Sequence, residues 1–269
     1  MKCCFCGPVK NCGPFLDKVF KNIEQLSSLF DDYCIIIFYD KSSDNSLQKL
    51  KEYQNKNNKL YFYENKYPVS VYRTHRIAYA RNFCLQIIKK NLHDYEFFAM
   101  MDFDDPNSKS CNLNVLKDYL ERNNWDGLSF NTSPKYYDIW GLSIYPFCFS
   151  YNHFNNNYKY HNIIGNYINN KLNNLNETEL LPCISSFNGF SIYRINKFIN
   201  CKYDGRPRLD LMPQSWLFAH IQAQKSKIIY KNYGHINGYY EDCEHRSFHI
   251  EAIFKNRAKI MISPKFLFT

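Results

Sequence analysis

At its most informative point the chain reads Glu96-Phe97-Phe98-Ala99-Met100-Met101-Asp102-Phe103-Asp104-Asp105-Pro106, an apolar run that leads directly into three carboxylates. A short apolar run that ends in turn residues is typical of a strand buried on both faces, as in a parallel sheet. Carboxylates at the end of such a strand lie where open α/β sheets bind their ligands. The stretch therefore predicts a central strand with a ligand site at its carboxyl end.

The two aspartates of this stretch, Asp102 and Asp104, are separated by one residue. In an extended chain their side chains face the same way, while Phe103 packs behind them. Two carboxylates a few Å apart repel each other unless a cation or a proton lies between them. Oxygen ligands suit Mg²⁺ or Mn²⁺, ions that often bridge a protein to a diphosphate. The alternative interpretation is a polar turn after a core strand, ended by Asp105-Pro106.

Buried strands and amphipathic helices alternate on the N-terminal side of this stretch. Apolar runs predict strands at residues 3–6, 34–39, 60–63 and 97–101, and helical spacing predicts helices at residues 14–30, 47–56 and 72–91 between them. This alternation argues for a parallel sheet with crossover helices. A further helix at residues 112–122 and a strand at residues 125–130 are expected to extend it.

The C-terminal half has a weaker pattern. Residues 136–176 are rich in Asn and Tyr, and we expect irregular structure with short strands or helices there, too polar to form core. Residues 184–193 are strand-like, residues 210–224 can form a helix, and residues 259–263 can form a last strand. Between these, residues 241–249 gather two glutamates, an aspartate and two histidines.

Composition narrows the class of protein. With 269 residues and 45% hydrophobic residues, the chain can form one large globular domain or two small ones. Its net charge is +9, but the Lys residues are dispersed and form no long basic runs. This pattern fits compositional drift in an AT-rich genome, which could belong to a cellular host or to a virus. The eleven cysteines form no paired framework and are expected to be reduced thiols in the core.

Targeting signals are not apparent in the sequence. No apolar run approaches the roughly 18 residues of a membrane span. Lys10 and Asn11 interrupt the apolar start that a signal peptide would need. We therefore expect a cytoplasmic protein with no membrane span.

Three segments carry a family likeness: residues 39–46 (Tyr-Asp-Lys-Ser-Ser-Asp-Asn-Ser), Ala80-Arg81-Asn82 and Asp102-Phe103-Asp104. In this order they resemble the nucleotide-contacting loop, the Ala-Arg-Asn helix and the Asp-any-Asp motif of GT-A-fold glycosyltransferases, in particular glycosyltransferase family two. Arg76-Ile77-Ala78 before Arg81-Asn82 also resembles the fungal capsular α-1,3-mannosyltransferases. The likeness covers about residues 1–130, and the loop after the second strand lacks the glycine usual in the family.

The resemblance implies a GT-A-like, Rossmann-type α/β fold with a mostly parallel sheet and helices on both faces. Residues 1–130 would bind the nucleotide sugar, and residues 131–269 would bind the acceptor within the same domain. On the donor side it implies that the following residues bind the nucleotide or its metal: Asp40, Ser42 and Asp44 at base and ribose, Arg76 and Arg81 at the diphosphate, and Asp102 with Asp104 at Mn²⁺ or Mg²⁺.

The C-terminal half matches the family only through Glu241-Asp242-Cys243-Glu244-His245. This segment resembles the Glu-Asp motif that supplies the general base in inverting members, so Asp242 or Glu244 could deprotonate an acceptor hydroxyl. In other members a C-terminal histidine is the third metal ligand, a role open to His245 or His249 because imidazole suits Mn²⁺. The alternative for His245 and His249 is that they are ordinary surface or core histidines, and the alternative for Asp242 and Glu244 is a solvated loop.

Three functions remain open on the sequence. The first is a metal-dependent glycosyltransferase that moves a sugar from a nucleoside-diphosphate sugar to a glycan or glycoprotein acceptor. The second is a metal-dependent phosphotransferase or nuclease, which usually needs more carboxylates to hold two metals. The third is a basic nucleic-acid-binding protein, but no aromatic module signature supports a nucleic-acid partner. The sequence fixes neither the sugar, the acceptor, the stereochemical outcome nor the oligomeric state.

Overall fold

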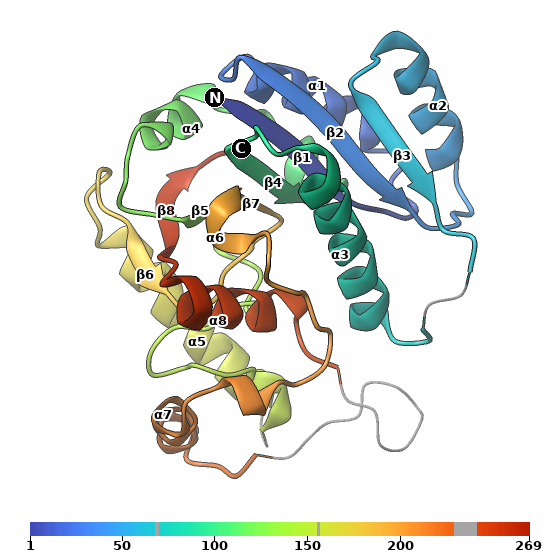
Figure 1. The fold of residues 1–269 in the computed structure, drawn as a ribbon. Helices are drawn as coiled ribbons and strands as arrows, with labels where there is room; N and C mark the ends of the chain where they lie inside the picture. The colour runs from blue at the N-terminus through green and yellow to red at the C-terminus, as the bar shows by residue number, and fades with distance from the viewer. Residues whose placement is uncertain (68–69, 155–156, 229–240) are drawn as a thin grey trace.

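The computed structural model describes residues 1–67, 70–154, 157–228 and 241–269 (Figure 1). Their strands form a single sheet in the order β3-β2-β1-β4-β7-β5-β8-β6. The strand bounds are β1 (Lys2–Val9), β2 (Asp32–Tyr39), β3 (Leu60–Glu64), β4 (Phe97–Met101), β5 (Gly127–Asn131), β6 (Leu181–Cys183), β7 (Phe190–Arg194) and β8 (Ile260–Phe266).

Most neighbouring strands run parallel. β3, β2, β1 and β4 form one parallel run, and β5 pairs in parallel with β8. β7 is antiparallel to both β4 and β5, and β6 is antiparallel to β8. The predicted α/β fold with a mostly parallel sheet is confirmed, and strands from both halves of the chain are hydrogen-bonded in the same sheet.

Helices cover both faces of the sheet. Their bounds are α1 (Leu16–Ser27), α2 (Ser46–Lys56), α3 (Arg73–Asn91), α4 (Leu113–Leu120), α5 (Asn157–Asn173), α6 (Ile195–Phe198), α7 (Gln214–Gln224) and α8 (Glu244–Asn256). One hydrophobic cluster joins α1, α2 and α4 to one face, and a second joins α3, α6 and α8 to the other. Successive side chains of β1 point to opposite faces of the sheet, so Phe5 packs in the first cluster and Cys6 in the second.

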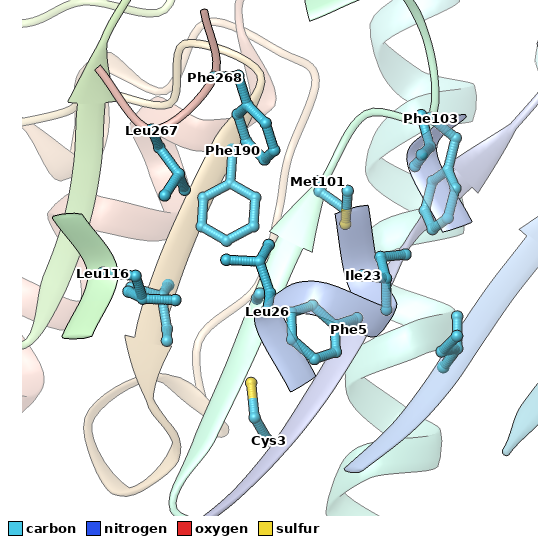
Figure 2. Packing of buried hydrophobic residues seen from close by; sticks show 14 of the residues in the cluster. Cys3, Phe5, Ile23, Leu26, Met101, Phe103, Leu116, Phe190, Leu267 and Phe268 are labelled. Carbon is cyan, nitrogen blue, oxygen red and sulfur yellow. The ribbon is translucent and has the colours of Figure 1, made fainter. Parts of the chain in front are cut away.

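The end of β4 is anchored in the first cluster. Figure 2 shows Met101 and Phe103 among the side chains of that cluster, together with Phe5 and Ile23. Phe103 is buried and makes an edge contact with Phe20 of α1, with the ring centroids 6.3 Å apart. The chain is thus held on both sides of Asp102, which fixes where this aspartate leaves the sheet.

Two expectations for the C-terminal half are wrong. Residues 157–173 form a regular helix, α5, whose Ile164, Ile168 and Leu172 are buried in a separate hydrophobic cluster with Tyr136. The spacing of these three residues is helical, but the polar residues between them weaken the pattern. The segment therefore contributes core as well as surface.

The state of the cysteines agrees with the expectation of reduced thiols in the core. The eleven cysteines are all free, and most are buried, so they pack as small apolar side chains. Among the described residues, no helix combines the length and the apolar character needed to cross a membrane.

Candidate active site

The first part of the site lies at the carboxyl edge of the parallel strands. A cavity of about 240 Å³ opens there. Its lining includes Lys10 after β1, Asp40 after β2, Asn65 after β3, and Asp102 and Asp104 after β4. Since parallel strands end at the same edge, residues far apart in the sequence meet in one hollow. Three of these residues, Asp40, Asp102 and Asp104, are ones that the sequence singled out.

The N-terminus of α3 closes one side of this cavity. Arg73, the first residue of the helix, and Arg76 both line it. Arg76 Nη1 donates hydrogen bonds to the carbonyl oxygens of Ser70 (3.0 Å) and Val71 (2.7 Å), which holds its side chain against the chain that enters the helix. A helix N-terminus carries partial positive charge, so this wall of the cavity suits an anion.

The carboxylate pair gives the cavity its electrostatic character. Asp104 is exposed, and the side chain of Asp102 is 31% exposed. Desolvation by the surrounding protein, followed by repulsion from Asp102, raises the pKa of Asp104 to about 7. The raised pKa indicates that the negative charge of Asp104 is poorly compensated by the protein alone. Such a pair stabilises a divalent cation, because the ion removes the repulsion.

Arg81, which the resemblance assigns to the diphosphate, forms ion pairs with two carboxylates. Its Nη2 donates to Asp102 Oδ1 at 2.9 Å and its Nε donates to Glu244 Oε1 at 3.0 Å. The side chain is only 3% exposed. Burial opposes its charge, but Asp102 and Glu244 outweigh burial, so the pKa of Arg81 is raised. Arg81 therefore connects α8 to the chain after β4, and it does not line the first cavity.

A second, smaller cavity of about 130 Å³ adjoins the first. The two share Arg73, Ile77 and Asp102 in their lining. The remaining lining residues of the second cavity are Arg81, Tyr137, Asp138, Trp140, Phe187, Cys243, Glu244 and His245. Residues from α3, from the end of β4, from the chain after β5 and from α8 thus meet at one place.

The two histidines of α8 have different surroundings. His245 lines the second cavity, and its ring stacks on Phe187 with centroids 3.8 Å apart. Burial, and then the charge of Arg81, lowers the pKa of His245, so its imidazole is neutral and able to bind a metal. His249 is fully buried, and its ring nitrogens lie 2.9 Å from Ser185 Oγ and 2.9 Å from Tyr193 Oη. His249 lines neither cavity.

The two acids of the C-terminal motif are both engaged in ion pairs. Asp242 is 1% exposed and accepts a hydrogen bond from Arg246 Nε at 2.8 Å. Arg246 also donates to the carbonyl oxygens of Trp140 (2.5 Å) and Leu142 (3.2 Å), so the pair ties α8 to the chain after β5. Glu244 pairs with Arg81 and lines the second cavity, whereas Asp242 lines neither. Burial excludes the alternative of a solvated loop.

Ser42 and Asp44 hold the loop after β1. Ser42 Oγ accepts the Asn11 N–H at 3.0 Å, and Asp44 Oδ2 accepts the Gly13 N–H at 2.8 Å. Neither residue belongs to the lining of the first cavity. Their hydrogen bonds hold the loop that carries Lys10, so they position a lining residue without lining the cavity themselves.

Sequence reasoning missed four polar lining residues: Lys10, Asn65, Arg73 and Asp138. Lys10 and Asn65 follow the first and third predicted strands, so the rule that singled out Asp40 and Asp102 would also have found them. Arg73 begins the predicted third helix, which is a position for anion binding. Asp138 had no comparable signal, because it lies in a segment without regular periodicity.

The residues present are compatible with a divalent cation, although they do not form a complete set of ligands. No group of three or more His, Cys, Asp or Glu side chains able to hold a metal occurs in the described part of the chain. Asp102 and Asp104 supply two hard oxygen ligands beside an anion-binding wall. A diphosphate and water would supply the remaining oxygens, as Mg²⁺ sites commonly require.

Fold and site together define an α/β protein with an acidic cluster where the chain leaves β4. The sequence of residues 4–190 matches the family model described as "Glycosyl transferase family 2". This match spans more than half of the chain, so the protein belongs to glycosyl transferase family 2. The family selects the glycosyltransferase among the three functions left open by the sequence.

Solved structures with similar architecture are distant. The first 349 residues of S. aureus TarS show 14% identity and a TM-score of 0.41, over 85% of this chain and 57% of that one. The mannosyltransferase PcManGT from Pyrobaculum calidifontis, in complex with GDP-Man and Mn²⁺, shows 11% identity and a TM-score of 0.43, over 76% and 47%. Glucosyl-3-phosphoglycerate synthase from Mycobacterium tuberculosis, in complex with UDP, shows 10% identity and a TM-score of 0.42, over 74% and 58%.

These likenesses are too remote to support an assignment of substrate, and the family membership rests on the sequence match. The chain also spans only 57% of the TarS fragment. No curated protein matches the sequence.

Proposed function

We propose that this protein transfers a sugar from a nucleoside-diphosphate sugar to a hydroxyl group of a glycan or glycoprotein acceptor, with the help of Mn²⁺ or Mg²⁺. The observation that carries the proposal is the first cavity, where Asp102 and Asp104 face the N-terminus of α3 with Arg73 and Arg76. The two carboxylates suit a cation, and the two arginines in the same lining suit an anion. A diphosphate bound through a divalent ion satisfies both.

The donor would lie along the carboxyl edge of β1, β2 and β4. Asp40 and Asn65 lie where a ribose would reach, and their side chains are joined by a 3.1 Å hydrogen bond. Ser42 and Asp44 would support this part of the site through the loop after β1. The first 130 residues thus form the donor half, and residues 131–269 contribute the acceptor side of the same sheet.

The chemistry follows from the arrangement. A bound cation neutralises the charge that develops on the leaving diphosphate. Arg73 and Arg76 would bind the same oxygens, whereas Arg81 would orient Asp102. Charge-assisted contacts of this kind stabilise the transition state because they are in place before the charge develops.

The C-terminal acids keep distinct proposed roles. Asp242 remains the candidate general base, and it would have to exchange its contact with Arg246 for one with the acceptor hydroxyl. Glu244 would act through Arg81. His245 is the better placed of the two histidines to complete the metal shell, since it lines the second cavity and its nitrogens have no hydrogen-bond partner among the described residues. His249 would support the core beneath it.

The test is a donor screen with purified protein. Binding of UDP- and GDP-sugars is measured by calorimetry with and without Mn²⁺. The likeness of Arg76-Ile77-Ala78 to the α-1,3-mannosyltransferases makes GDP-mannose part of the panel. Hydrolysis of nucleic acid without any sugar donor would instead favour a nuclease and contradict the proposal.

A further inference from the structure

The second cavity contains a carboxylate that the proposed function has not used. Asp102, Asp138 and Glu244 are its lining acids. Asp102 and Glu244 are both paired with Arg81. Asp138 forms no ion pair with any described residue, and its Oδ1 accepts one hydrogen bond from the Gly141 N–H at 3.0 Å. Of these three acids, Asp138 alone forms no ion pair with a described side chain.

The backbone holds Asp138 in a fixed relation to Asp102. Asn188 Oδ1 accepts the N–H of Asp138 at 3.1 Å, and its Nδ2 donates to the Phe130 carbonyl oxygen at 2.9 Å. The next residue, Gly189, accepts the N–H of Asp102 at 2.9 Å through its carbonyl oxygen. Asn188 and Gly189 adopt positive φ angles of 55° and 84°, so the chain makes a specific turn here. One turn therefore positions both carboxylates.

A close approach at Gly141 also fixes the carboxylate. A Cβ atom at this position would lie 2.5 Å from Asp138 Oδ2 and 3.1 Å from Asp138 Cγ. Glycine thus allows the chain to fold tightly around the side chain. A larger residue at position 141 would push the Asp138 carboxylate away from its present place without changing its chemistry.

Unsatisfied polar atoms surround the same cavity. Arg81 Nη1 and both ring nitrogens of His245 are buried and have no hydrogen-bond partner within the described residues. Buried polar groups normally have partners, so these atoms indicate a polar ligand. The rings of Tyr137 and Trp140 also line the cavity. Aromatic faces next to separate donors and acceptors match a sugar ring, which has apolar faces and several hydroxyl groups.

The other chemical classes fit less well. Three carboxylates in the lining repel a phosphate group, although Arg73 and Arg81 offset part of this charge. A metal ion bound by protein alone would need three or more ligands in place, and no such group occurs in the described part of the chain. An uncharged polyol avoids both difficulties.

We propose that Asp138 is a specificity-determining residue that accepts hydrogen bonds from hydroxyl groups of a sugar ring bound in the second cavity. This inference rests on the proposed function and extends it. The sugar belongs either to the donor or to the acceptor, and the chemistry of recognition is the same for both. Arg81 Nη1 would contact the same ring, while the diphosphate stays in the first cavity.

The test compares Asp138→Asn and Gly141→Ala with Asp118→Asn, a control that removes an exposed carboxylate on α4. Binding of the nucleoside diphosphate alone, binding of the nucleotide sugar and the KM for the acceptor are measured for each. We expect both site variants to bind the nucleoside diphosphate like the wild type. A lost hydrogen bond to a charged group should weaken sugar recognition by about tenfold or more.

The affected parameter identifies the sugar. Weaker binding of the nucleotide sugar assigns the cavity to the donor sugar, and a higher acceptor KM with unchanged donor binding assigns it to the acceptor. The inference is overturned if Asp138→Asn leaves both parameters unchanged, or if it weakens the nucleoside diphosphate and the nucleotide sugar equally. It also fails, together with the proposed function, if the wild type binds the nucleoside diphosphate but no nucleotide sugar. Asp138→Asn remains decisive if Gly141→Ala does not fold.

Discussion

Replacing Arg81 by alanine distinguishes its two interpretations, as a diphosphate ligand or as a link between α8 and the chain after β4. The substitution leaves Glu244, whose side chain is 6% exposed, and Asp102, at 31%, without the cation between them. Removing one partner of a buried ion pair costs about 3–5 kcal/mol. Burial already raises the pKa of Glu244. Its carboxylate can therefore take up a proton, and we expect a loss of stability near the lower end, about 3 kcal/mol.

The measurement is the free energy of unfolding in guanidinium chloride, combined with nucleoside-diphosphate affinity. Arg73→Ala is the matched control, because Arg73 is exposed and lines both cavities. It should change stability by less than about 0.5 kcal/mol. It should weaken nucleotide binding by about 1.5–3 kcal/mol, as expected for a lost charge-assisted hydrogen bond.

A double substitution tests whether the ion pair itself causes the loss. Arg81→Met combined with Glu244→Gln removes both charges, so it should be more stable than Arg81→Met alone by at least about 1 kcal/mol. The reasoning is refuted if Arg81→Ala costs less than about 1 kcal/mol of stability while weakening nucleotide binding more than Arg73→Ala does.

The remaining predictions concern the metal, pH, the general base and the turn. Asp102→Ala or Asp104→Ala should abolish metal-dependent donor binding in calorimetry while thermal melting still shows a folded protein; wild-type turnover with Mn²⁺ would disprove the assignment. Because the pKa of Asp104 is raised to about 7, protonation of Asp104 stabilises the folded state, and this contribution to stability is lost as the pH rises from about 4 to about 7. Since a metal binds the deprotonated carboxylate, Mn²⁺-dependent nucleotide affinity should rise between about pH 6 and 8. A pH-independent Mn²⁺ affinity would contradict this. Asp242→Asn should abolish transfer but keep nucleotide-sugar binding, and retained turnover would exclude Asp242 as the base. Gly189→Ala should lower stability by about 1–3 kcal/mol, since its φ is +84° and a Cβ would lie 2.7 Å from Tyr137 Oη; an unchanged melting temperature would contradict the close approach.

Much of the N-terminal half could be predicted from the sequence, because each local pattern there agrees with the fold. The apolar run at residues 97–101 forms β4 as expected, and Phe103 packs into the core while Asp102 and Asp104 line one cavity. Strand alternation and the periodicity of α3 are local signals, so they survive in a single sequence. They also locate the edge of the sheet where the site forms.

The C-terminal half shows why the rest could not be predicted. α8 is buried along most of its length, so it lacks the one-sided apolar stripe that marks a surface helix. Its first residue, Glu244, is paired with a residue far away in the sequence, Arg81 of α3. The position of Asp138 depends on a turn about fifty residues later in the chain, at Asn188. Contacts of this range leave no local pattern.

The most direct test of the central claim is calorimetric titration of nucleotide sugars into the wild type and into Asp104→Asn, each with and without Mn²⁺. We predict that at least one UDP- or GDP-sugar binds to the wild type, and that this binding weakens when Mn²⁺ is removed or when Asp104 is replaced. The account would be contradicted if no nucleotide sugar binds in the presence of Mn²⁺, or if binding is equally tight without the metal and in the variant.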